Sequence, residues 1–239
     1  MSEARASSRP PLPFIILAVL TAAVFLVDLW AIFILAPVED QMGIVQKIFY
    51  FHVPSAYAMY LGFVVCGVSS AVYLVKRTPR WDGWALAGAE IGTLFCLIVI
   101  ITGPLWARKA WGIWWTWDPR LTSTMLAGLV FAAYLALRSF GTAGETERVF
   151  SAGLGIVGIL DLPIIHYATR KWGGQHPTVI TKQGGGLHPD MGTALAISFV
   201  AFTLLVVLLL WARARTQAAG QRLQEAELEA AQMGLLEDA

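Results

Sequence analysis

Four tryptophans within seven positions are the densest chemical feature of this 239-residue sequence. They lie in the segment Trp111-Gly112-Ile113-Trp114-Trp115-Thr116-Trp117-Asp118-Pro119-Arg120. Flat indole rings at this density make either an anchor at a membrane surface or a wall for a large planar ligand. A role as membrane anchor explains one or two such rings. Four tryptophans in a segment that ends in Asp-Pro-Arg favour a ligand-binding surface.

A helix over residues 111–118 would make this segment an aromatic shelf. Trp111, Trp114, Trp115 and Asp118 would share one face, because they are spaced i, i+3, i+4 and i+7. The shelf would carry a carboxylate at its end, and Trp117 would point elsewhere, toward lipid.

The histidines are the other candidate ligand-binding groups, because a neutral imidazole binds metals and haem iron. His52 follows the aromatic run Ile48–Phe51 at the expected entrance of a helix. His176 lies in Trp172-Gly173-Gly174-Gln175-His176-Pro177, where glycines give the backbone freedom to bring the ring over a ligand. His188 is a rival to His176. A lone histidine at a membrane surface is more often a hydrogen-bonded surface residue, so this interpretation depends on where the chain places these residues.

The composition is that of a membrane protein. Apolar residues make up 57% of the chain and charged residues 14%, whereas soluble domains have about 45–50% and about 25%. A net charge of +1 gives no electrostatic support for binding nucleic acid. Cys66 and Cys96 lie singly in apolar runs and form no metal-binding or redox motif.

Six apolar segments have about the length needed to cross a bilayer. The sequence therefore predicts an all-α integral membrane protein with one domain over residues 1–212, followed by a charged helical tail over residues 213–239. The predicted spans are residues 14–36, 56–75, 84–104, 121–137, 149–167 and 191–211.

An even number of spans places both termini on one side of the membrane. With the termini in the cytoplasm, that side carries ten of the 17 Lys and Arg residues, including the short basic loop at 76–80. We therefore expect cytoplasmic termini and three outer loops at 37–54, 105–120 and 169–190. All four histidines then lie on or near the outer face, and the tryptophan segment lies in its second loop.

Three carboxylates fall inside the predicted spans, at Asp28, Glu90 and Asp161. Such groups are costly in a membrane and are candidates for function. They show no repeat between the two halves of the chain, which argues against a solute transporter. No role is assigned to them or to His166.

The pattern Trp-Gly-x-x-Trp-x-Trp-Asp-x-Arg-Leu-Thr at residues 111–122 resembles the WWD signature of haem-handling proteins in cytochrome c maturation. Within this group the chain most resembles the haem exporter protein C (CcmC) family of the bacterial system I pathway, over about residues 14–212. Residues 50–56 and 162–167 contribute to the resemblance. The CcmF and CcsA types are usually longer with more spans, so a cytochrome c synthetase component of their kind is the alternative.

The resemblance implies a haem transfer or export protein in the bacterial inner membrane rather than a conventional enzyme, although it could promote covalent attachment of haem. It implies that haem b is bound at the periplasmic face by two axial histidines, which match His52 and His176. The WWD segment would contact the haem and present it to the haem chaperone CcmE, within a complex containing CcmA, CcmB and CcmD. The matching residues of this segment are Trp111, Gly112, Trp114, Trp115, Trp117, Asp118 and Arg120.

A membrane-bound redox cytochrome is a less favoured alternative. Such a protein more often places its histidine pairs inside the spans on facing helices, and only His166 fits that arrangement.

Overall fold

The computed structural model describes residues 10–140, 144–176 and 187–233, and this part of the chain is all helical. The prediction of an all-α protein with six helices able to cross a membrane is confirmed for these residues. The long helices are α1 (Leu12–Trp30), α2 (Phe49–Lys76), α3 (Pro79–Trp111), α4 (Pro119–Phe140), α5 (Glu145–Trp172) and α6 (Pro189–Gln232). A π-helical turn, η1 (Ala31–Leu35), extends α1, and a 3-10 turn, η2 (Ile44–Ile48), leads into α2.

Helices α2 to α6 are longer than the apolar segments that predict them. The third predicted span ends near Pro104, whereas α3 continues through Pro104 to Trp111, over 33 residues. Helix α2 begins at Phe49, so His52 lies on a helix and not in a loop. Helix α6 has 44 residues, or about 66 Å at 1.5 Å per residue, and it includes most of the residues expected as a separate tail.

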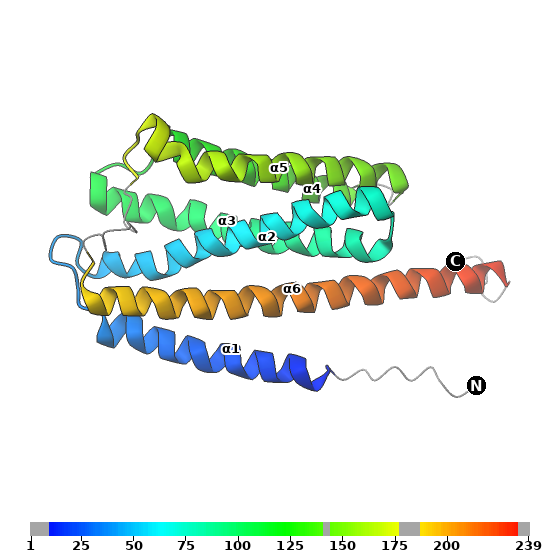
Figure 1. Ribbon diagram of the computed structural model, residues 1–239, viewed down its shortest axis with the longest axis horizontal. Helices are drawn as coiled ribbons and strands as arrows, with labels where there is room; N and C mark the ends of the chain where they lie inside the picture. The colour runs from blue at the N-terminus through cyan, green and yellow to red at the C-terminus, as the bar shows by residue number, and fades with distance from the viewer. Residues whose placement is uncertain (1–9, 141–143, 177–186, 234–239) are drawn as a thin grey trace.

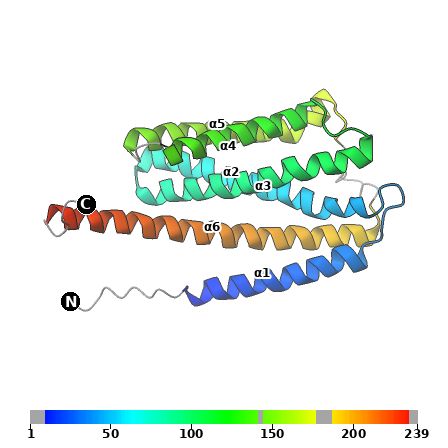
Figure 2. The same ribbon diagram turned by 180° about the vertical axis from the view of Figure 1, so that it is seen from behind.

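The helices form a bundle in which α6 lies between α1 and the central pair α2–α3, with α4 and α5 on the far side (Figures 1 and 2). Small residues allow the central pair to pack closely. A Cβ added at Gly62 would lie 2.5 Å from the backbone of Gly92, so the two helices meet backbone to backbone. The core beside this contact includes the stacked rings of Phe63 and Phe131, whose centroids are 3.7 Å apart.

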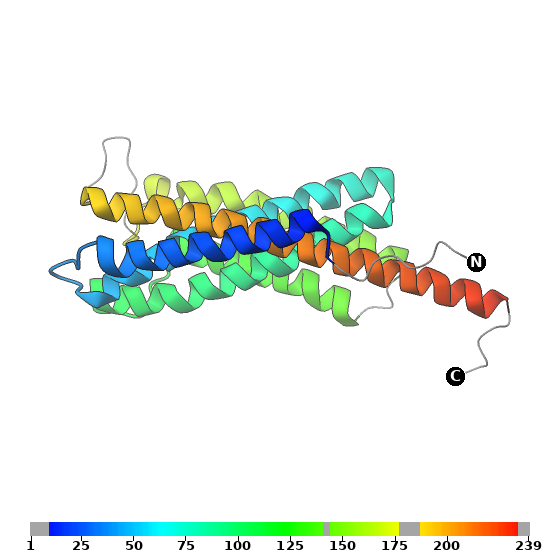
Figure 3. The same cartoon turned by 90° about the horizontal axis from the view of Figure 1, so that it is seen from below.

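Three connections gather at one end of the bundle (Figure 3). They are residues 36–48, residues 112–118, and residues 173–176 after α5. The start of α1 and the end of α6 lie toward the opposite end (Figure 1). The sequence predicts this grouping of connections, and the assignment of their end to the periplasm stays a prediction.

Candidate functional site

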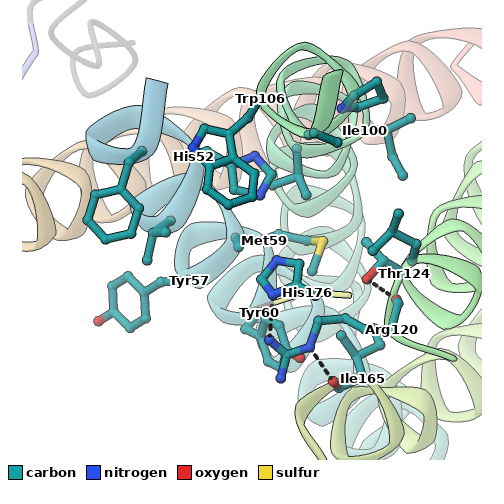
Figure 4. Close-up of a pocket in the computed structure, with 18 of the residues that line it drawn as sticks. His52, Tyr57, Met59, Tyr60, Ile100, Trp106, Arg120, Thr124, Ile165 and His176 are labelled. Atoms are coloured by element: carbon teal, nitrogen blue, oxygen red, sulfur yellow. Dashed lines mark hydrogen bonds between the residues drawn. The ribbon is translucent and has the colours of Figure 1, made fainter. Parts of the chain in front are cut away.

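A cavity of about 470 Å³ lies at the end where the three connections meet. Its volume falls in the range of about 300–1,000 Å³ that is usual for pockets that bind small molecules and cofactors. Helices α2, α3, α4 and α5 provide most of its walls, and Figure 4 shows His52 and His176 beside the same space. Apolar and aromatic side chains dominate the lining. Its charged and imidazole-bearing residues are His52, Arg120, His166, Arg170 and His176.

The tryptophan segment is not a helix, and the expectation of a shelf on one helical face is wrong. Helix α3 ends at Trp111, where Gly112 takes a φ of +78° and donates its N–H to the carbonyl of Arg108. A positive φ is readily adopted only by glycine, so Gly112 ends the helix. Residues 113–118 then run without helical structure to the start of α4.

The four tryptophans divide into two pairs as a result. Trp111 and Trp115 line the cavity. Trp114 and Trp117 do not, and they are 56% and 73% exposed. The Arg108 guanidinium lies 6.0 Å from the centre of the Trp114 ring, and the Trp117 ring meets the Trp115 ring edge-on. Trp117 therefore lies outside the cavity lining, but the helix from which its outward direction was predicted does not form.

Asp118 starts helix α4 and does not line the cavity. Its Oδ1 accepts the backbone N–H of Leu121 at 2.9 Å, which is the bond made by a residue that caps a helix N-terminus. Pro119 is the first helical residue, a position that suits proline because its missing N–H would have no partner there. The Asp-Pro pair was therefore a signal for a helix start, and it excluded a helix over residues 111–118.

Arg120, in the first turn of α4, connects three parts of the site. Its Nε donates to the carbonyl of Ile165 at 3.2 Å, and its Nη2 donates to the carbonyl of His166 at 3.1 Å. Its Nη1 lies 3.1 Å from Nδ1 of His176 (Figure 4). The arginine thus holds His176 against α5 at the edge of the cavity.

His52 lies in the first turn of α2, and its Nδ1 is 2.8 Å from the hydroxyl of Thr102 on α3. The Thr102 hydroxyl donates in turn to the carbonyl of Ile98 at 2.6 Å. The rival histidine lies elsewhere. His188 does not line the cavity, and its ring accepts the backbone N–H of Asp190 at the start of α6. The geometry therefore favours His176 over His188 as the partner of His52.

Several lining residues were not singled out by the sequence. Trp106 packs edge-on against Trp111 with ring centroids 5.4 Å apart, which extends the aromatic wall down α3. Arg170 and Tyr60 also face the cavity. Helical spacing could have identified Arg170, because it follows His166 by four residues and so shares its face of α5.

The three carboxylates inside the spans lie outside the cavity lining. Asp28 on α1 is fully buried and accepts the Ser198 hydroxyl of α6 at 2.7 Å. Glu90 on α3 pairs with Arg213 on α6. These two contacts connect helices and account for their presence without a direct part in binding.

Fold and site together define the class: a multi-pass membrane protein, all helical in the described residues, with a cavity that tryptophans and histidines line. A family model described as "Heme exporter protein C" (CcmC) matches residues 6–229. The chain belongs to this family, as its sequence predicts.

Individual relatives support the same assignment. Heme exporter protein C of Rhodobacter capsulatus is 34% identical over 226 residues, which cover 90% of each chain. The protein of the same name from Bradyrhizobium diazoefficiens is 34% identical over 197 residues, covering 81% of this chain and 74% of the relative. A "putative cytochrome c biosynthesis ccmC-like mitochondrial protein" of Marchantia polymorpha is 29% identical and covers 78% of each chain.

Proposed function

We propose that this protein binds haem b in the cavity between His52 and His176 and passes it to the haem chaperone CcmE during cytochrome c maturation. Membership of the heme exporter protein C family supports a role in cytochrome c maturation and the handling of haem. The single observation that carries the binding site is the presence of both histidines on one aromatic-walled cavity.

The cavity residues suit haem as a cargo. The porphyrin is a flat, mostly apolar ring, and Trp106, Trp111 and Trp115 provide flat apolar walls. The iron accepts imidazole nitrogen, which His52 and His176 supply. Arg120 and Arg170 provide cations for the two propionate groups, because guanidinium pairs well with carboxylate.

The described residues argue against a site for a bare metal ion, since they include no cluster of three or more His, Cys, Asp or Glu side chains.

Two histidines on opposite sides of a porphyrin would fill both axial positions of the iron. The protein would then hold haem without an open coordination position, which suits storage and transfer better than catalysis.

We assign transfer to the exposed part of the tryptophan segment. Trp114 and Trp117 lie outside the cavity at the same end of the bundle, and Arg108 lies over Trp114. Exposed aromatic rings beside a cation are common at protein interfaces. They would contact CcmE, and the CcmA, CcmB and CcmD subunits would complete the complex in the bacterial inner membrane, with this end in the periplasm.

A transfer assay tests the function. Purified protein loaded with haem is mixed with the soluble domain of CcmE, and haem that stays bound to CcmE on a denaturing gel is measured. We expect transfer by the wild type, and reduced transfer with nearly normal haem content for Trp114→Ala and Trp117→Ala. Normal transfer by both variants would show that these rings serve only as a membrane-interface anchor.

A further inference from the structure

The hydrogen bonds of His52 determine which of its nitrogens can bind iron. The Thr102 hydroxyl has one proton, and it gives that proton to the carbonyl of Ile98 at 2.6 Å. At the 2.8 Å contact with His52 the hydroxyl must therefore accept, so Nδ1 of His52 carries the proton. The neutral ring then has its lone pair on Nε2.

The His52 ring is also fixed in place by packing. A Cβ added at Gly103 would lie 3.4 Å from Cε1 of His52, so the ring rests against the backbone of α3 at this point. A hydrogen bond from the second nitrogen of a metal-binding histidine sets its tautomer and its orientation. His52 is thus arranged as a ligand before any iron is present.

His176 has the opposite arrangement. An arginine can only donate, so at the 3.1 Å contact Nδ1 of His176 accepts from Nη1 of Arg120. The neutral ring then carries its proton on Nε2. The lone pair on Nδ1 is engaged by Arg120, and Nε2 has no lone pair to offer, so neither nitrogen can bind iron as the ring stands. The two hydrogen bonds from Arg120 to carbonyls of α5 keep the arginine in this position.

We propose that the two histidines are not interchangeable: Thr102 presents His52 for immediate binding of iron, whereas Arg120 blocks His176 until it withdraws. This inference rests on the proposed function. Binding through Nδ1 of His176 requires the contact with Arg120 to open. Binding through Nε2 requires the same opening, together with movement of the ring proton from Nε2 to Nδ1, which leaves the number of protons unchanged. In both cases His52 binds first, and Arg120 becomes available to a carboxylate when His176 binds.

The order can be measured by mixing the haem-free protein with ferric haem and following the absorption spectrum in time. We expect a first phase, whose rate rises with haem concentration, to a spectrum with one histidine ligand. A second phase, independent of haem concentration, gives the spectrum with two. His176→Ala retains only the first phase, and His52→Ala loses the fast first phase.

Two matched pairs of variants separate positioning from a general structural effect. Thr102→Val has nearly the shape of threonine without the hydroxyl, and we expect it to weaken haem binding by about 10–100-fold. Thr102→Ser keeps the hydroxyl and restores binding. Arg120→Met accelerates the second phase about tenfold, whereas Lys109→Met removes an exposed cation near the end of α3 that does not line the cavity, and it leaves the second phase unchanged.

The outcomes distinguish this inference from the proposed function. If Thr102→Val binds haem like the wild type, or if His52→Ala keeps the first phase, the inference is wrong even though the cavity binds haem. If Arg120→Met leaves the second phase at its original rate, Arg120 does not block His176. If the wild type binds no haem at all, the proposed function itself fails.

Discussion

Polar side chains pair with one another at one end of the bundle and border a cavity at the other. At the charged end, which we define by Asp82, Arg138, Glu147 and Arg148, ionised groups from α3, α4 and α5 neutralise one another. Arg138 lies 2.8 Å from Asp82 and 3.8 Å from Glu147, and Arg148 lies 3.7 Å from Asp82. At the aromatic end, which is the end with the cavity, the histidines and arginines border a space large enough for a ligand.

This difference assigns the two ends different roles: the charged end stabilises the fold, and the aromatic end binds the ligand. Asp82, Arg138 and Glu147 are almost completely buried, so each depends on its partners to offset the loss of water. The aromatic end instead keeps a cavity between helices, although a closed and well-packed core would be more stable. Substitutions at the charged end should therefore affect folding, and substitutions at the aromatic end should affect haem.

The largest expected effect comes from breaking the charged end with Arg138→Met. The change leaves Asp82 with Arg148, 3.7 Å away, as its remaining partner at this end. Removing one member of a buried ion pair costs up to about 3–5 kcal/mol of unfolding free energy. Thermal unfolding of the purified protein in detergent measures the loss, and the haem content of the folded fraction should not change. The double variant Asp82→Asn/Arg138→Met should lose less than the sum of the two single variants. A fall in haem content equal to the fall in stability would contradict the separation of the two ends.

A smaller effect is expected from the tryptophans of the aromatic end, where Trp115 and Trp117 form a matched pair. Trp115→Ala removes a wall of the cavity and should weaken haem binding by about 2 kcal/mol, or about 30-fold. Trp117→Ala removes a ring that is 73% exposed and should leave affinity unchanged. Titration of the haem-free protein with haem measures both, and equal losses would place the two rings in the same role.

The smallest expected effect concerns Asp118. Asp118→Ala removes the cap of α4 and should cost about 1 kcal/mol of unfolding free energy. Asp118→Asn retains a capping oxygen and should cost much less, because asparagine caps helices as well as aspartate does. If Asp118→Asn loses haem while its melting temperature stays normal, the carboxylate charge has a direct part in binding that the geometry does not assign to it.

The order of the helices could be predicted from the sequence. A segment that crosses a membrane must satisfy its backbone hydrogen bonds internally, and a single apolar run does this by forming a helix. The second to sixth predicted spans each fall within a longer helix, and the first falls within α1 and η1 apart from Ala36. The helices continue into segments of mixed polarity beyond the apolar runs. Hydropathy gives no signal for those extensions, so His52 and Trp111 were expected in loops.

The cavity could be predicted only in part. The His52 and His176 candidates and the tryptophan segment follow from residue type and family resemblance. The hydrogen bond from His52 to Thr102 joins residues 50 apart, and the pair Asp82–Arg138 joins residues 56 apart. Contacts of this kind depend on which helices pack together, and no local pattern specifies that. The division of the tryptophans into two pairs was not predicted, because the spacing of the rings fits one face of a helix. The Asp118-Pro119 pair instead marks the start of α4.

The central claim is that His52 and His176 together bind the iron of one haem. The most direct measurement is the absorption and electron paramagnetic resonance spectrum of the purified haem-loaded protein, for the wild type, His52→Ala and His176→Ala. We predict the low-spin spectrum of iron with two histidine ligands for the wild type, and loss of that spectrum in each variant. Unchanged haem content and unchanged spectra in both variants would contradict the claim.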